Sequence, residues 1–139
     1  MTIKEAERDD IPQIIQLYAA LFDEELNMEE VHKNYETLNR DETCGLLVAK
    51  EKDEVVGTCS VFICTSLAEK FLVVEDVVVK AQSRELGIGK QLFQIVDEIA
   101  EANRCAYAIL ISSGFRKGAH IFYEKMGYVD DVRGFRKVY

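Results

Sequence analysis

Two adjacent carboxylates interrupt an otherwise apolar, β-branched run of the sequence, VVEDVVVK, at residues 73–80. Such a run predicts a buried strand. Because successive side chains of a strand point to opposite faces, Glu75 and Asp76 cannot share one face. At least one of them should then be poorly solvated, which is costly for an ion without a partner. An ion pair or a wetter strand end would explain the carboxylates structurally, and a proton acceptor in catalysis would explain them functionally.

A loop with two glycines, RELGIGK at residues 84–90, follows this strand and precedes an amphipathic helix. The Gly87-x-Gly89 spacing is common by chance, so the signal comes from its place between strand and helix. Glycines there allow backbone N–H groups to approach an oxyanion, and the helix N-terminus adds partial positive charge. The loop predicts a phosphate or pyrophosphate site, with a tight structural turn as the alternative. A Walker loop and a dinucleotide fingerprint fit less well, because Gln91 and Leu92 replace residues that those motifs require.

The hydrophobic periodicity of the chain predicts the elements that must position these residues. Apolar residues at helical spacing, with Pro12 in the first turn, indicate a helix from residue 11 that is capped by Asp9 or Asp10. The run CGLLVAKEKDEVVGTCSVFIC is typical of a β-hairpin. The order of the helices and strands expected along the chain predicts one mixed α/β domain over residues 1–139. The expected elements are strand 2–7, helices 11–22 and 29–39, a hairpin within 44–64, strand 73–80, helix 88–103, strand 106–112, helix 118–126, and one or two closing strands within 127–139.

Two motifs together resemble the GCN5-related N-acetyltransferase (GNAT) superfamily. The first is VVEDVVVKAQSRELGIGKQLFQIV, residues 73–96, which is similar to the family's core strand, its Q/R-x-x-G-x-G/A pyrophosphate loop and the following helix. The second is GAHIFYEKMGY, residues 118–128, which is similar to the family's A-x-x-F-Y-x-x-x-G-[FY] helix and turn. The resemblance implies an α/β fold with a mixed, mostly antiparallel sheet. A central parallel pair of strands would splay apart, and about four helices would flank the sheet.

The resemblance also implies acetyl-CoA, or another short acyl-CoA, as the acyl donor, with no metal. The loop would bind the CoA pyrophosphate through backbone amides, and the strand would offer backbone groups to the pantetheine arm and the thioester. One departure is Arg116, which stands where many members carry Asn and cannot accept a hydrogen bond. Arg116 or Lys117 could meet a CoA phosphate, or form a solvated basic loop. The implied cofactor-binding residues are Val77, Val78, Val79, Arg84, Glu85, Leu86, Gly87, Ile88, Gly89 and Lys90.

The same resemblance implies two catalytic residues. A protonated amine has no lone pair, so acetyl transfer to an amine needs a base near the acceptor. We expect Glu75 to be this base, on the same side of its strand as Val77 and Val79. Asp76 would orient it or serve the structure. Tyr123 would protonate the departing CoA thiolate, although its helical spacing alone is typical of a core aromatic residue.

Charge and composition narrow the range of partners. The net charge of −8 argues against nucleic acid and anionic membranes and permits a cationic acceptor. The segment DEELNMEE, residues 23–30, is either a solvated helix start or an acidic lip that attracts amines. No apolar run approaches the length of a membrane span, and the polar N-terminus is not typical of a signal peptide. The four cysteines form no CxxC motif, which indicates free thiols in a reducing cytoplasm rather than a metal site.

Two functions from different classes are consistent with these features. The first is an acetyl-CoA-dependent N-acetyltransferase, in which a small-molecule or peptide amine attacks the thioester directly in a ternary complex. A small cationic amine fits the acidic balance. The alternative is a non-catalytic GNAT-like module that binds acyl-CoA as a sensor or partner domain. The presence of both Glu75 and Tyr123 favours the enzyme. A homodimer is an expectation from the family alone.

Overall fold

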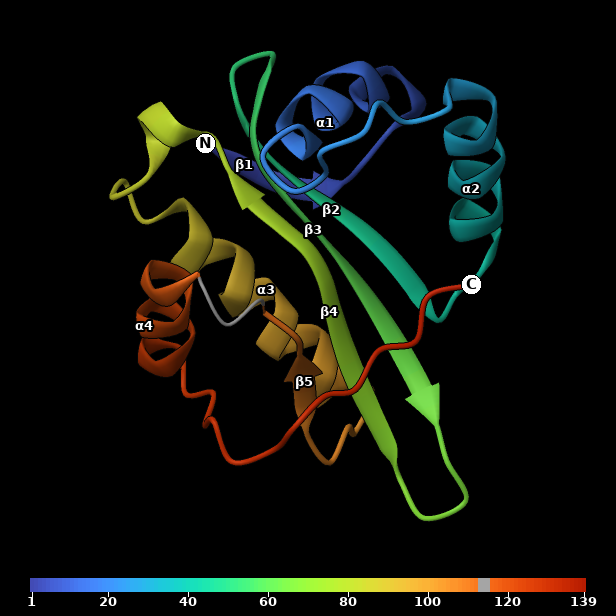
Figure 1. Ribbon diagram of the computed structural model, residues 1–139, viewed down its shortest axis with the longest axis vertical. Coiled ribbons are helices and arrows are strands. Elements are labelled where there is room, and N and C mark those ends of the chain that lie inside the picture. Colours follow the sequence, from blue (N-terminus) through green and yellow to red (C-terminus); the bar gives the residue numbers. More distant parts are fainter. Residues whose placement is uncertain (113–115) are drawn as a thin grey trace.

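The computed structural model describes residues 1–112 and 116–139, which form a five-stranded mixed sheet with flanking helices (Figure 1). The predicted α/β fold and the order of elements up to the last helix are confirmed, although the first helix ends at Tyr18 instead of Phe22. The strands are β1 (Thr2–Glu5), β2 (Cys44–Glu51), β3 (Glu54–Thr65), β4 (Lys70–Val79) and β5 (Ala108–Leu110). The helices are α1 (Ile11–Tyr18), α2 (Met28–Arg40), α3 (Ile88–Ala102) and α4 (Lys117–Lys125), with 3-10 turns at Arg8–Asp10 and Ala81–Ser83.

The strand order is β1-β2-β3-β4-β5, antiparallel from β1 to β4 and parallel between β4 and β5. The parallel ladder is short, and its last pair is Val74 with Leu110. β4 continues to Val79, whereas β5 ends at Leu110, so that β4 extends beyond its parallel partner (Figure 1). The parallel pair that splays apart, expected from the family resemblance, is therefore confirmed.

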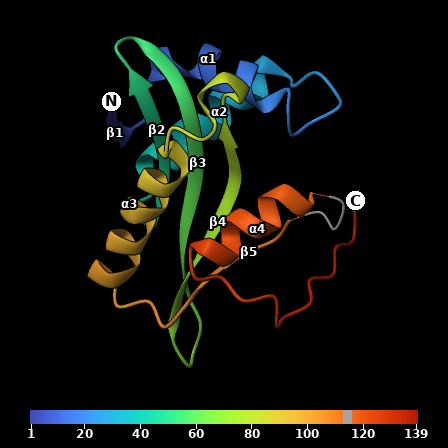
Figure 2. The ribbon, with the colours of Figure 1, turned by 90° about the vertical axis from the view of Figure 1, so that its left-hand side faces the viewer.

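Two hydrophobic layers cover opposite faces of the sheet. Figure 2 shows α3 on one side of the strands and the C-terminal tail on the other. On the α1 face, Ile14 packs with Val48 and Val55. The α3 layer is built from four residues at helical spacing, each at most 1% exposed: Ile88, Leu92, Phe93 and Val96.

None of the helices in the described part of the chain combines the length and the apolar character that a membrane span needs.

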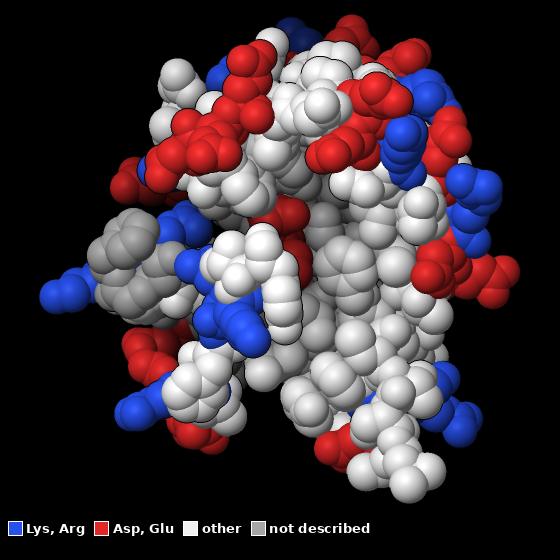
Figure 3. Space-filling view, turned by 45° about the vertical axis from the view of Figure 1, so that its right-hand side comes forward, with Lys and Arg blue, Asp and Glu red and all other residues white. Residues whose placement is uncertain are grey.

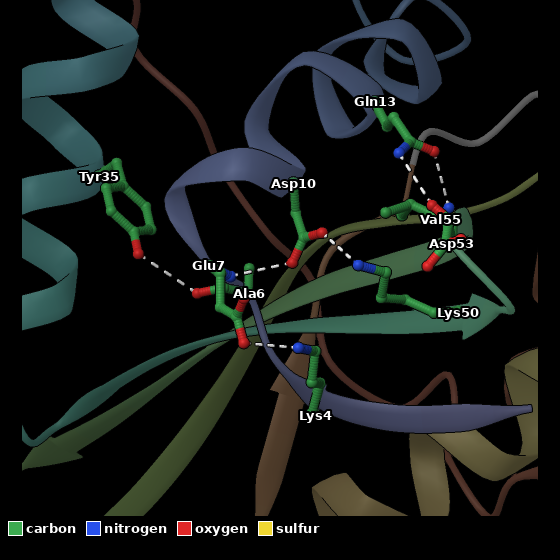
Figure 4. Close-up of polar contacts among 9 residues, drawn as sticks. All are labelled: Lys4, Ala6, Glu7, Asp10, Gln13, Tyr35, Lys50, Asp53 and Val55. Carbon is green, nitrogen blue, oxygen red and sulfur yellow. Dashed lines mark hydrogen bonds and ion pairs between the residues drawn. The ribbon is translucent and has the colours of Figure 1, made fainter.

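A buried ion pair holds the start of α1 against the sheet (Figure 4). Asp10 is 2% exposed and accepts hydrogen bonds from Lys50 Nζ at 2.6 Å and from Glu7 N at 3.0 Å. Burial alone would raise the pKa of Asp10, but the bonds from Lys50 and Glu7 hold that pKa below its usual value. Asp10 stands at the N-cap position of α1 without capping it, because β2 and the preceding turn engage its carboxylate.

The residues after α4 do not form the closing strands that the sequence predicts. Residues 127–139 contain no strand, so β5 is the last strand of the described sheet. Gly127 ends α4 with φ +93°, as expected for the position after a helix. The tail then crosses in front of the sheet near Ile111, where a Cβ on Gly134 would lie 3.3 Å from Cδ1 (Figure 1). An alternating pattern predicts an extended chain, but a strand also needs a partner edge in register.

Candidate active site

The opening between β4 and β5 is the centre of the candidate site. Beyond Val74 and Leu110, β4 has β3 on one side and no strand of the described chain on the other. Backbone N–H and C=O groups on the free side of residues 75–79 can therefore pair with an extended ligand. Both carboxylates and the strand residues predicted to bind the acyl donor lie on this part of β4.

A β-bulge lies in β4 at the two carboxylates. Ser60 of β3 lies opposite Glu75, and Thr58 lies opposite Val78, so β4 has one residue more than β3 between these pairs. Asp76, inside the bulge, has φ +51°, a left-handed conformation that is strained for a residue other than glycine. Strain of this kind persists where the surrounding structure enforces it, and it is common at functional sites.

The bulge overturns the expected orientation of Glu75. The β3 partners of Glu75 and Val78 are two residues apart and share the face on which α1 packs. Glu75 and Val78 therefore point to the α1 side, whereas Val77 and Val79 pack against the α3 layer. The expectation that Glu75 points to the same side as Val77 and Val79 is wrong, because strict alternation fails at the extra residue.

No described residue forms an ion pair with Glu75 or Asp76. Burial raises the pKa of Asp76, and burial together with the charge of Asp76 raises the pKa of Glu75. No group of three or more His, Cys, Asp or Glu in the described chain could hold a metal ion. The described residues thus offer no ionic partner for the two carboxylates, which leaves them open to a cationic ligand.

Tyr18 is a neighbour of Asp76 that sequence reasoning missed. Burial, and then the charge of Asp76, raises the pKa of the Tyr18 hydroxyl to about 12, while Ser60 acts in the opposite direction. This hydroxyl stays protonated at neutral pH beside a carboxylate. The helical pattern places Tyr18 on the buried face of its helix. The only feature of the sequence that could have indicated a further role was the hydroxyl group of Tyr18 on that apolar face.

The glycine loop leaves unpaired amides at the start of α3. Gly87, the N-cap residue of α3, has φ +77°, and no atom lies within 4 Å of the place of a Cβ. The amides of Ile88, Gly89 and Lys90 donate no hydrogen bond to the described residues, as is usual in a first helical turn. A helix N-terminus with open space before it suits an anionic group, so these residues fit the CoA pyrophosphate.

The other predicted loop residues lie at the surface. Arg84, Glu85, Leu86 and Lys90 are exposed, and Arg84 Nε donates to Val79 O at 3.4 Å. Ile88 is 1% exposed, and its side chain belongs to the core. Ile88 can therefore contact a ligand only through its backbone.

Gly89 has a packing role that the loop motif did not reveal. A Cβ at this position would lie 2.9 Å from Cζ of Phe122 on α4, closer than real side chains approach. The close contact between α3 and α4 therefore requires a glycine here. The backbone approach to an oxyanion, which the sequence suggests as the reason for Gly89, stays a prediction.

Tyr123 lies in the hydrophobic core where α4 meets α3. It is 8% exposed, and its ring centroid is 5.8 Å from that of Phe93. Burial raises the pKa of Tyr123, the positive charge of Arg116 lowers it, and Cys59 raises it. The ring is a core residue, as its helical spacing predicts, while the role of its hydroxyl stays a prediction.

Acidic side chains gather on one face of the molecule (Figure 3). Figure 3 shows acidic side chains gathered over the upper part of this face, above a hollow with further acidic side chains at its base. Basic side chains border the hollow at the lower left. Five carboxylates of the segment 23–30 are exposed: Asp23, Glu24, Glu25, Glu29 and Glu30.

A separate cavity of about 330 Å³ lies between α2 and the start of β2. Its lining includes Tyr35, Asn39, Asp41 and Cys44. None of the residues predicted to bind or react lines this cavity. The candidate site is therefore placed at the bulge and the glycine loop.

The chain matches a known family model and several solved structures. A model described as acetyltransferase (GNAT) family matches residues 11–128. Glucosamine-6-phosphate N-acetyltransferase from Arabidopsis thaliana is similar with a TM-score of 0.86 and 24% identity, covering 99% of this chain and 97% of that one. An acetyltransferase from Trypanosoma brucei is similar with a TM-score of 0.84 and 25% identity. A transcriptional regulator from Bacillus halodurans C-125 is similar with a TM-score of 0.89 and 24% identity. Each of these two matches covers 99% of this chain and 99% of the other chain. No protein of curated function matches the sequence significantly.

Proposed function

This chain belongs to the acetyltransferase (GNAT) family, and on that premise we propose that it transfers an acetyl group from acetyl-CoA to a primary amine. The acceptor is a small cationic amine, which attacks the thioester directly while both substrates are bound. The single observation that carries the proposal is the bulge in β4. It sets two carboxylates without a described ionic partner beside the opening where β4 and β5 separate.

The donor side of the site is built from backbone groups. The amides of Ile88, Gly89 and Lys90, with the helix dipole of α3, bind the pyrophosphate, and the open space at Gly87 admits it. The free side of residues 77–79 pairs with the pantetheine arm, as a further strand would. Bound in this way, acetyl-CoA supplies an activated acyl group at the opening.

The acceptor side is built from the two carboxylates. Their negative charge attracts an ammonium group, and Glu75 removes one proton to free the lone pair that attacks the carbonyl carbon. The raised pKa of Glu75 makes it a stronger base than a carboxylate with its ordinary pKa. Asp76 contributes by placing a second negative charge next to it.

The leaving group is the CoA thiolate, and the Tyr123 hydroxyl donates a proton to this thiolate. The carbon–nitrogen bond forms as the carbon–sulfur bond breaks. The ammonium group gives up two protons, one to Glu75 before the attack and one to solvent as the amide forms, while the sulfur takes one proton from Tyr123, which regains a proton from solvent. Arg116 assists because its charge lowers the pKa of Tyr123. The products are the acetylated amine and free CoA.

The test is release of free thiol from acetyl-CoA in the presence of a panel of amines. The panel contains polyamines, amino sugars, aminoglycosides, amino acids and a lysine peptide, and calorimetry measures acetyl-CoA binding in parallel. Thiol release that depends on an amine supports the proposal. Tight acetyl-CoA binding without turnover on the whole panel contradicts it, and indicates a binding module instead.

A further inference from the structure

An aromatic pair at the end of α1 presents apolar surface to solvent. The rings of Tyr18 and Phe22 meet edge to face, with centroids 5.7 Å apart. Phe22 lies one turn beyond the end of α1, and its amide donates to Tyr18 O at 3.0 Å. Tyr18 packs against the hydrophobic layer between α1 and the sheet, whereas Phe22 is 40% exposed. The core therefore covers the inner ring of the pair and leaves the outer ring accessible.

The inner ring, Tyr18, lies at the carboxylates of β4. Ser60 of β3 lies opposite Glu75, and cross-strand partners on one face have Cβ atoms about 4.5–5.5 Å apart. The side chain of Ser60 also hydrogen-bonds the Tyr18 hydroxyl, and the charge of Asp76 acts on the same hydroxyl. The tip of Tyr18 is therefore beside the bulge, on the α1 face to which Glu75 points.

The two rings connect the carboxylates to the surface. The contacts run from the bulge to the hydroxyl of Tyr18, along its ring, and on to the ring of Phe22. A ligand whose charged group reaches Glu75 or Asp76 along these rings meets mostly carbon on the way. An unbranched chain of methylene groups suits such a surface. A sugar ring would place hydroxyl groups against it without partners, which is unfavourable.

We propose that Tyr18 and Phe22 form an apolar wall of the acceptor site and select a primary amine carried on an unbranched aliphatic chain. The inference rests on the proposed function and deepens it, because it names the class of acceptor. The ammonium group lies at Glu75 and Asp76, and the methylene groups lie along the two rings. Full burial of one methylene group strengthens binding by about fourfold, and contact on one side strengthens it by less.

Attraction between the ammonium group and a ring face would have a different consequence. Such a cation–π interaction depends on the charge of the ligand and its distance from the ring. It would therefore favour all unbranched alkylamines equally. A wall that contacts the aliphatic chain instead makes the reaction faster as the chain becomes longer.

The experiment measures kcat/KM for propylamine, pentylamine and heptylamine through thiol release from acetyl-CoA. Each amine carries one charge, with a pKa near the value of about 10.4 for a lysine side chain, so the fraction of free amine is nearly constant along the series. In the wild type each added methylene group should raise kcat/KM by about two- to fourfold. Phe22→Ala and Phe22→Gln should reduce this rise to less than about 1.5-fold, and Phe22→Leu should restore part of it.

Tyr107→Ala is the matched control. Tyr107 is 46% exposed and stacks on Phe71, with centroids 5.2 Å apart. Its carbonyl accepts from Leu72 N, three residues of β4 before Glu75, or about 10 Å along the strand. Removal of this ring should leave the effect of chain length unchanged. The effect is a ratio within one protein, so a partly folded variant still reports it.

A wild-type kcat/KM that does not rise with chain length overturns the inference. An unchanged rise in Phe22→Ala or Phe22→Gln overturns it as well, and so does an equal loss in Tyr107→Ala. If no amine of any class supports thiol release, the proposed function itself fails. Turnover of other amines, with no reaction of the alkylamines or no effect of chain length, defeats the inference alone.

Discussion

At the scale of single residues, Asp76 acts on Glu75 through charge. Two carboxylates at adjacent positions disfavour each other's ionisation, and the pKa of Glu75 is raised by burial and by Asp76. A general base works best when its pKa is near the working pH. The strained conformation of Asp76, with φ +51°, is then a structural cost associated with the site.

The pH dependence of the reaction tests the roles of the two carboxylates. If Glu75 is the base, kcat/KM rises with pH as Glu75 loses its proton. Asp76→Asn removes a like charge, so the pKa of Glu75 falls and this limb of the profile moves to lower pH. Glu75→Gln should abolish the limb and lower kcat/KM by about 10²–10⁴-fold at neutral pH. Profiles are measured with one amine, and an unchanged limb in Glu75→Gln would exclude this base.

The Tyr123 hydroxyl should affect the reaction rate more than binding. Tyr123→Phe keeps the ring packing and removes one proton donor, so kcat should fall by about 10²-fold, the low end for a general acid. The Kd for acetyl-CoA should change little, because the proton is needed as charge develops on sulfur. Tyr35→Phe, which lies by the separate cavity, is the control. Wild-type kcat in Tyr123→Phe, with chemistry rate-limiting, rules out Tyr123 as the acid.

At the scale of elements, the contact between α3 and α4 joins the two parts of the proposed donor site. The first turn of α3 carries the unpaired amides, and α4 carries Tyr123. Phe93 of α3 contacts the rings of both Phe122 and Tyr123, at 5.5 Å and 5.8 Å between centroids. Gly89 permits this arrangement because any side chain there would meet Phe122.

A double-mutant cycle tests this packing. Gly89→Ala gains up to about 1 kcal/mol of helix propensity, but overpacking against Phe122 typically costs about 1–3 kcal/mol, so the variant should be less stable. In a Phe122→Leu background the same change should become neutral or stabilising. Gly87→Ala should cost about 1–2 kcal/mol in both backgrounds, because its cost is conformational. Urea unfolding measures all six proteins, and an equal effect of Gly89→Ala in both backgrounds would refute the contact.

At the scale of the whole molecule, charge acts in two ways. A partly buried ion pair between Asp10 and Lys50 joins the start of α1 to the sheet, and salt should screen it less than an exposed pair. The exposed carboxylates of residues 23–30 instead contribute to an acidic field on a chain of net charge −8. The first should govern stability, and the second should govern the approach of a cationic acceptor.

The ion pair predicts a loss of stability in acid. The pKa of Asp10 is lowered by folding, so its stabilisation is complete above the unfolded pKa of about 3.9 and is lost as pH falls through the folded value. Asp10→Asn should cost about 1.5–3 kcal/mol at pH 7, and the difference from wild type should shrink below pH 4. Glu36→Gln, which breaks the exposed pair with Arg8, should cost less. A pH-independent difference for Asp10→Asn would contradict the assignment.

The acidic segment predicts that acceptor KM depends on salt. Exposed charges are screened over about 8 Å at physiological ionic strength, so KM for a cationic amine should rise with added salt. Glu24→Gln with Glu25→Gln should raise KM at low salt and flatten this dependence. Glu98→Gln with Glu101→Gln changes the same charge on α3 and should leave the dependence unchanged. An equal salt dependence of KM in the two double variants would indicate that residues 23–30 are only a solvated surface.

Local sequence patterns determined most of the secondary structure and part of the site. The spacing of Ile88, Leu92 and Val96 predicted the buried face of α3, and the two motifs predicted the splayed strands and the family. Gly87 takes the left-handed conformation that only glycine adopts readily. The buried face of α3 and the conformation of Gly87 depend on neighbours close in the chain, so the sequence records them directly, whereas the splayed strands were expected from the family resemblance.

Contacts between distant segments were decided only by the tertiary structure. The bulge reverses the face of Glu75, because the register between β3 and β4 depends on both strands together. Gly89 faces Phe122, a residue of another helix, and residues 127–139 stay unpaired because an extended segment becomes a strand only beside a matching edge. The nearness of Tyr18 to Asp76 is visible only once the packing of α1 on the sheet is known. One-dimensional periodicity encodes which face of an element is apolar, but not which atom of another element meets it.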